Sequence, residues 1–204
     1  MRYGIGVVVA IVLGTAACTG GSPGPSTGST TTASPTPTAT ATTTATATVT
    51  RTATLPAGFA TTAASSPGFP AATAHVIGSA VRVGGHGTYD RVVYEFAGTG
   101  APAFRVRYVA RPIGDPSGSP VLVRGAAYLE VVVSGLGYPE PGDPEPQQLS
   151  TAALAGTVVA ESGVLYGGFE GTGQTFIGVR DRVRAFRAYA LAGPPRLVVD
   201  IATG

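Results

Sequence analysis

The sequence predicts an all-β fold, a single β-sandwich of about nine short strands that follows a signal peptide and a disordered tether. The C-terminal part of the chain alternates apolar residues with a period of two, as in DRVVYEF and PRLVVDI. Stretches rich in glycine and proline, such as GYPEPGDPEPQQ, interrupt these runs roughly every ten residues. A region of about 130 residues is long enough to bury one core, so we expect one domain.

Residues 1–17 have the layout of a secretory signal peptide. Arg2 supplies a positive start, and no charged residue follows up to Ala17 in a run that contains VVVAIVLG. This run of about fifteen residues is short for a permanent membrane span, which needs about 20. A positive start, a short apolar stretch and small residues after it are typical of a segment that is removed on export.

Cys18 is the one cysteine of the chain, and it directly follows the apolar run. The stretch LGTAAC resembles a bacterial lipobox, although Thr15 replaces the common leucine and Leu13 stands two places earlier. The resemblance implies that Cys18 becomes a lipidated N-terminus, anchored by fatty chains such as palmitate to the extracytoplasmic face of the cell membrane. Two or more fatty chains anchor a protein stably where a single fatty chain does not, because each buried methylene contributes about 0.8 kcal/mol. The alternative is a secreted protein with an idle thiol.

Residues 18–72 are predicted to form a disordered tether. The tract is dominated by Thr, Ala, Ser, Pro and Gly, as in TTTASPTPTATATTTATATVT, and Arg51 is its only charged residue. Such a tract has few large apolar side chains to bury, so it cannot offset the entropy lost on ordering. Tracts of this kind are also targets of O-glycosylation. Both a plain spacer and a glycosylated one remain open.

Residues 73–204 carry all eleven acidic residues of the chain. They also carry eleven of the thirteen basic residues, since Arg2 and Arg51 lie outside (13 − 2 = 11), so their net charge is near zero. Modules that bind nucleic acid normally have a basic excess, and the sequence therefore argues against a nucleic-acid partner.

Nine segments of this region are predicted as strands from their alternation and composition. They are residues 74–83, 90–96, 103–111, 119–125, 128–134, 156–166, 173–180, 183–191 and 195–201. The only helical candidate is QQLSTAALAG, in which Ser150 begins one turn at most.

The strand AFRVRYVAR presents the best candidate for a binding surface. Its alternation puts Arg105, Arg107 and Arg111 on the face opposite to Phe104 and its apolar neighbours. Guanidinium groups bind carboxylates and phosphates, which wall peptides and anionic wall polymers offer. The alternative is a solvated sheet face whose arginines pair with Glu95 and Glu130. A second group of arginines follows later in the chain: Arg180, Arg182, Arg184 and Arg187.

The sequence indicates no catalytic, metal or cofactor site. Its two histidines, His75 and His86, lie at the tether junction and in a predicted turn, and residues 73–204 contain no G-x-S-x-G elbow. No Cys/His cluster occurs, and the proline-rich loop with Glu140, Asp143 and Glu145 lacks the spacing of a calcium loop. We interpret that loop as a solvated acidic one.

Four carboxylates would be the candidates for glycan hydrolysis, which needs two of them facing each other. They are Glu95, Glu130, Glu170 and Asp200. Nothing in the sequence brings two of them together. Asp200 is interpreted as a half-buried carboxylate paired with an arginine. Glu170 lies between glycines in GGFEGTG, which makes it a possible ligand contact or only a hairpin tip.

Five motifs in order resemble the AMIN-like domain of lipoproteins from GC-rich Gram-positive bacteria. They are YDRVVYEF, FRVRYV, GAAYLEVVV, GGFEGTGQTFIGV and PPRLVVDI, and the resemblance covers residues 74–203. It implies a β-sandwich that binds or scaffolds at the cell envelope, and it brings no catalytic residues.

The expected protein is therefore an envelope lipoprotein whose domain binds cell-wall material, either peptidoglycan or an anionic polymer, without catalysis or cofactor. Two alternatives remain open. The first is a scaffold or inhibitor that binds another envelope protein, for example by strand addition at an open sheet edge. The second is a glycan hydrolase.

Overall fold

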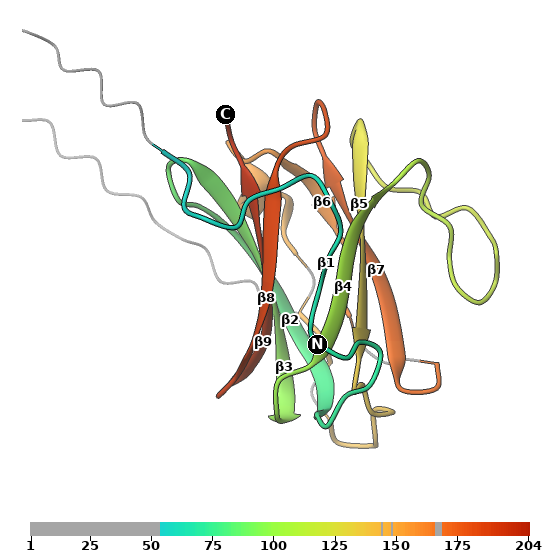
Figure 1. Ribbon diagram of the computed structural model, residues 1–204. Coiled ribbons are helices and arrows are strands. Elements are labelled where there is room, and N and C mark those ends of the chain that lie inside the picture. The colour runs from blue at the N-terminus through green and yellow to red at the C-terminus, as the bar shows by residue number, and fades with distance from the viewer. Residues whose placement is uncertain (1–53, 144, 148, 166–168) are drawn as a thin grey trace, which may run out of the picture. The chain divides into compact units, whose positions relative to one another are not determined.

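The computed structural model describes residues 54–143, 145–147, 149–165 and 169–204, and among them it contains two facing antiparallel sheets (Figure 1). One sheet has the strand order β1-β4-β5-β7-β6, and the other has the order β2-β3-β9-β8. The strands are β1 Ala64–Ser65, β2 His75–Gly85, β3 Tyr89–Thr99, β4 Ala103–Val109, β5 Ala127–Ser134, β6 Val159–Ser162, β7 Thr172–Val179, β8 Phe186–Ala192 and β9 Pro195–Ala202. The predicted all-β sandwich is confirmed.

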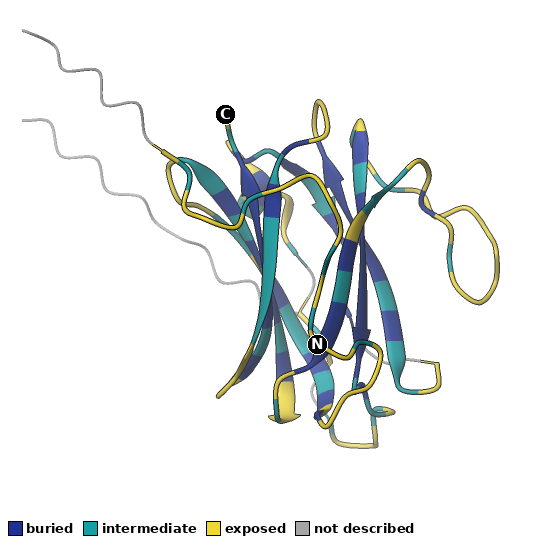
Figure 2. Cartoon of the chain, in the orientation of Figure 1, coloured by how far each residue is buried: buried dark blue, intermediate teal, exposed yellow. Residues whose placement is uncertain are grey.

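The core lies between the sheets and is built from the alternating residues of the strands. In β3, the side chains of Val92, Tyr94 and Phe96 are buried, and in β4 those of Phe104 and Val106 are buried (Figure 2). Each such side chain contributes about 1.5–3 kcal/mol when it is fully buried. The buried side chains of the central strands β5 and β9 complete this core: Leu129, Val131, Val133, Leu197, Val199 and Ile201.

Residues 119–125 form no strand, and this prediction is wrong. They belong to the yellow-green loop that projects from the five-stranded sheet in Figure 1, where the bridge between Ile113 and Pro120 is the only β pairing. Pro120 has no N–H to donate to a ladder, and neither has Pro116 or Pro112 across the loop. The side chain of Leu122 is 94% exposed as a result.

Residues 54–72 differ from the expected tether, because they lie on the sandwich. Ala64 and Ser65 form β1 against β4, and Ala60 exchanges two backbone hydrogen bonds with Phe186. Phe59 and Phe69 are the two aromatic residues of this tract, and each lies against an arginine of the domain. The predicted signal peptide, Cys18 and the tether up to residue 53 lie outside the described residues.

The helical candidate forms a single 3-10 turn, Thr151–Leu154, as its length predicted. The Ser150 hydroxyl accepts a hydrogen bond from the Ala153 N–H at 3.3 Å and caps the turn. Arg180 of the loop after β7 donates to the Leu154 carbonyl and ties the turn to the sheet. In the part of the chain that the structure describes, no helix is long and apolar enough to span a bilayer.

Candidate ligand-binding site

An open groove of about 670 Å³ lies on the outward side of the five-stranded sheet, and we call it the outer groove. Arg105 and Arg107 enter it from β4, and Glu130 enters it from the neighbouring strand β5. The loop 113–118 and the turn with Phe169 and Glu170 form further parts of its wall. Segments that lie far apart in the sequence therefore meet here. The volume is in the range of ordinary ligand sites.

Glu130 lies in the floor of the outer groove and is almost completely buried. One carboxylate oxygen accepts from Arg107 Nε at 2.6 Å and lies 3.9 Å from Arg105, and the other accepts from Gln174 at 2.8 Å. Burial alone would raise the pKa of the Glu130 carboxyl, but the hydrogen bonds from Arg107 and Gln174 and the two nearby positive charges lower its pKa below the ordinary value. Glu130 therefore stays ionised and holds both arginines.

The two arginines keep part of their binding capacity. The side chain of Arg105 is 39% exposed and that of Arg107 is 46% exposed. Arg105 stacks its guanidinium over Phe69 at 5.3 Å, and its buried Nε has no hydrogen-bond partner among the described residues. Two cations share the carboxylate of Glu130, so N–H donors are left for a carboxylate or phosphate of a ligand.

The turn beside the groove holds Glu170 in an uncommon backbone conformation. Glu170 and Gly171 have φ values of 51° and 73°, and the Thr172 N–H donates to the Phe169 carbonyl at 3.0 Å. Two consecutive residues with positive φ are typical of a type I′ hairpin turn. Residues other than glycine are uncommon there, and such positions gather at functional sites. The turn also exposes 61% of Phe169 at the groove.

The structure thus brings three of the four predicted ligand-binding residues together in one groove: Arg105, Arg107 and Glu170. Arg111 does not line it, because β4 ends at Val109 and the alternation of faces stops there. Sequence reasoning missed Gln174, which accepts from the Asp115 N–H at 2.9 Å and connects the projecting loop to Glu130. No sequence signal pointed to it, because its role depends on the pairing of β5 with β7.

The later arginines form contacts with backbone carbonyls or with acidic side chains. Arg180 donates to the Thr157 and Leu154 carbonyls, and Arg184 is buried and donates to the Thr203 carbonyl near the C-terminus. Arg187 pairs with Asp200 on the other sheet. None of these four arginines lines the outer groove.

Asp200 is paired as predicted but is buried more deeply. Its side chain is 0% exposed, and it accepts hydrogen bonds from Arg91 and from Arg187 across the four-stranded sheet. Glu95, on the same sheet, pairs with Arg82 at 2.9 Å and with neither arginine of β4. Among the described residues, no three His, Cys, Asp or Glu side chains form a cluster suited to a metal ion.

The fold and the groove define an all-β sandwich domain with a ligand-sized site on one outer sheet face. Residues 76–203 match the family model of the AMIN-like domain. The match covers more than half of the chain, so the chain belongs to the AMIN-like domain family, and the AMIN-like domain that the motifs predicted is confirmed. Searches of curated proteins and of solved structures found no match to this chain.

Proposed function

We propose that this chain is an envelope lipoprotein whose AMIN-like domain binds cell-wall material in the outer groove and does not transform it. The observation that carries the proposal is the meeting of Arg105 and Arg107 with Glu170 and the exposed ring of Phe169 in one groove. Family membership supports an envelope-related binding role. A fold alone does not determine a function, so the argument depends on the groove.

The charge pattern favours peptidoglycan over a uniform polyanion. Arg105 and Arg107 suit the carboxylates of wall peptides, and Glu170 suits their amines. Asp115 adds a further acidic residue to the groove. A polymer that carries only phosphates would meet these carboxylates and be repelled. Phe169 and Ile113 offer apolar surface beside the charges.

The ionised state of Glu130 argues against Glu130 as the general acid of a glycosidase. A glycosidase needs a carboxylic acid that keeps its proton, which requires a raised pKa. The pKa of the Glu130 carboxyl is lowered instead by Arg107 and Gln174, against the effect of burial. Glu130 accordingly acts as the anion that positions the two arginines.

The anchor in this proposal is the lipid on Cys18. From Cys18 to Thr54 the chain advances 36 residues (54 − 18), which span at most about 130 Å when fully extended. The domain can then reach wall layers outside the membrane. Cys18→Ala should move the protein from the membrane fraction to the medium, and retention of the variant in the membrane would contradict the anchor.

Sedimentation with purified peptidoglycan sacculi tests the ligand. The chain from Thr19 onward should bind, and Arg105→Ala with Arg107→Ala should weaken binding about tenfold or more, because charge-assisted hydrogen bonds contribute about 1.5–3 kcal/mol each. Arg82→Ala with Arg196→Ala removes the same charge from the other sheet and serves as the control.

Equal losses in the two double variants would mean that net charge and not the groove binds the wall. Unchanged binding in both would end the proposal. Binding to soluble polyphosphate but not to sacculi would replace peptidoglycan with an anionic polymer.

A further inference from the structure

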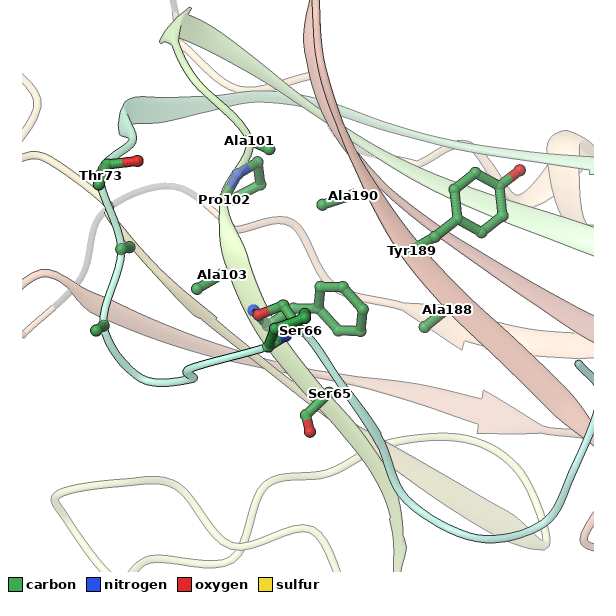
Figure 3. Close-up of a pocket in the computed structure, with 13 residues that line it drawn as sticks. Ser65, Ser66, Thr73, Ala101, Pro102, Ala103, Ala188, Tyr189 and Ala190 are labelled. Carbon is green, nitrogen blue, oxygen red and sulfur yellow. The ribbon is translucent and has the colours of Figure 1, made fainter.

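A second groove, which we call the edge groove, encloses about 630 Å³ along β8 (Figure 3). It opens at one side of the sandwich, between Ala188 and Ala190 of β8 and the start of β4 at Ala103 and Phe104. Ser65 of β1 lies at its rim. The outer groove shares none of these residues, so the two sites are separate.

β8 is the most open of the four edge strands. The edge of β2 is covered in part by Gly135, Gly137 and Gln147, which bond to the backbone of Val76 and Ser79. β1 has only two residues and β6 only four. β8 has seven residues, and the chain pairs with its edge only at Phe186 in the part that the structure describes. An edge of this kind is a template for a further strand.

The backbone of β8 presents an unused ladder to the edge groove. Phe186 directs its N–H and carbonyl outward, where both bond to Ala60 at 2.8 and 2.9 Å. This orientation recurs at every second residue of an antiparallel strand, so Ala188 and Ala190 direct their N–H and carbonyl groups the same way. Neither has a further backbone partner among the described residues.

The inward side chains of β8 leave room between the sheets. Ala188 and Ala190 point to the groove side, while the ring of Tyr189 lies on the other side of the strand (Figure 3). The paired strand β9 carries the larger Leu197 and Val199 toward the core. A strand added beside β8 would place alternate side chains in the space that the alanines leave.

The edge groove has no charged residue, although the described domain carries eleven arginines and eleven acidic residues. Its wall is made of small or apolar side chains with a few hydroxyls. An occupant with charges would lose hydration without gaining a partner. The unpaired backbone groups of β8 can form a strand ladder only with another peptide backbone, which a glycan does not have.

We propose that the edge groove binds an extended, uncharged segment of another envelope-exposed protein, which adds as a fifth strand beside β8. Its backbone pairs with Ala188 and Ala190, and its inward side chains fill the gap opposite Phe104. The AMIN-like domain then has two independent surfaces, the outer groove for the wall and the edge groove for a protein.

Photo-crosslinking of the full chain in its native cells tests this inference. Ala190→photo-leucine places a diazirine in the groove, and Leu191→photo-leucine, on the opposite face of β8, is the matched control. Mass spectrometry of the products should identify an uncharged segment of a second protein at position 190 and not at position 191.

Ala188→Pro removes an outward N–H without breaking the ladder to β9, which edge strands tolerate. It should reduce the crosslink at least tenfold, whereas Ala188→Ser, which keeps the N–H, should preserve it. Far-UV circular dichroism and the melting temperature of Ala188→Pro should stay close to those of the unaltered chain, which shows that the domain is folded.

Crosslinks to residues 19–53 of the same chain, to a second copy or to glycan alone would overturn the inference, and so would the absence of a specific crosslink at position 190. A crosslink that survives Ala188→Pro would overturn it too, because it excludes strand addition. None of these results bears on the peptidoglycan proposal, which the sacculus assay decides.

Discussion

Asp200→Ala tests how much the ion pairs on the outward face of the four-stranded sheet contribute to stability. Asp200 is completely buried and accepts from Arg91 Nε at 2.6 Å, from the same guanidinium at 3.0 Å, and from Arg187 Nε at 2.9 Å. The hydrogen bond to Asp200 raises the pKa of the Arg91 guanidinium above its ordinary value. Removing one partner of a buried ion pair costs about 3–5 kcal/mol.

The lower end of that range applies, because 26% of each arginine side chain is exposed and water can replace part of the lost contact. A loss of about 3 kcal/mol lowers the melting temperature by roughly 6–12 °C in a domain of this size. Far-UV circular dichroism of the chain from Thr19 onward measures the shift, with urea unfolding as a second measurement.

Glu95→Ala is the control, since Glu95 forms an exposed pair with Arg82 that is expected to contribute at most about 1 kcal/mol. If Asp200→Ala melts within about 2 °C of Glu95→Ala, the buried pair does not stabilise the sheet and the reasoning is refuted.

Three further predictions concern single residues. The pKa of Glu130 is lower in the folded than in the unfolded chain, so Glu130 stabilises the fold fully above its unfolded pKa, about 4.5, and this stabilisation is lost as the pH falls through the folded-state pKa. Below that pH the melting temperature of Glu130→Gln should therefore fall less steeply than that of the unaltered chain. Parallel melting curves for the two proteins would contradict this. Glu170→Gly should be more stable than Glu170→Ala by about 1 kcal/mol in urea unfolding, because only glycine accepts positive φ without cost; equal stabilities would exclude the left-handed conformation. Gly178→Ala should lower the free energy of unfolding by about 1–3 kcal/mol, since the new Cβ would collide with the Arg124 carbonyl. A neutral effect in urea unfolding would show that the loop with Arg124 moves to make room.

The strands that could be predicted were those with strict alternation. In β3 and β4 the apolar residues recur at every second position, and the structure buries Val92, Tyr94 and Phe104 accordingly. The prediction failed for residues 119–125, where VLV looked like a strand but no partner strand pairs with it. It also failed for Ala64 and Ser65, whose strand exists because β4 offers them an edge.

The candidate site could be predicted only in part. Arg105 and Arg107 share a strand face, which is a local property, and they were found. Their meeting with Glu170 depends on a hairpin turn 63 residues beyond Arg107 (170 − 107) and on the order in which β4, β5 and β7 pair. Glu130 looked like an outward residue of a solvated strand, yet it is buried under the arginines that neutralise it.

The amino-acid sequence by itself determined the fold class, the family motifs and the inward face of most strands, because an alternation with a period of two is a local property of neighbouring residues. Only the tertiary structure decided which segments share a groove, how deeply Glu130 and Asp200 lie, and which edge of the sandwich stays open. Those properties arise from pairings between residues far apart in the chain, and no local pattern encodes which strand will be the neighbour of another.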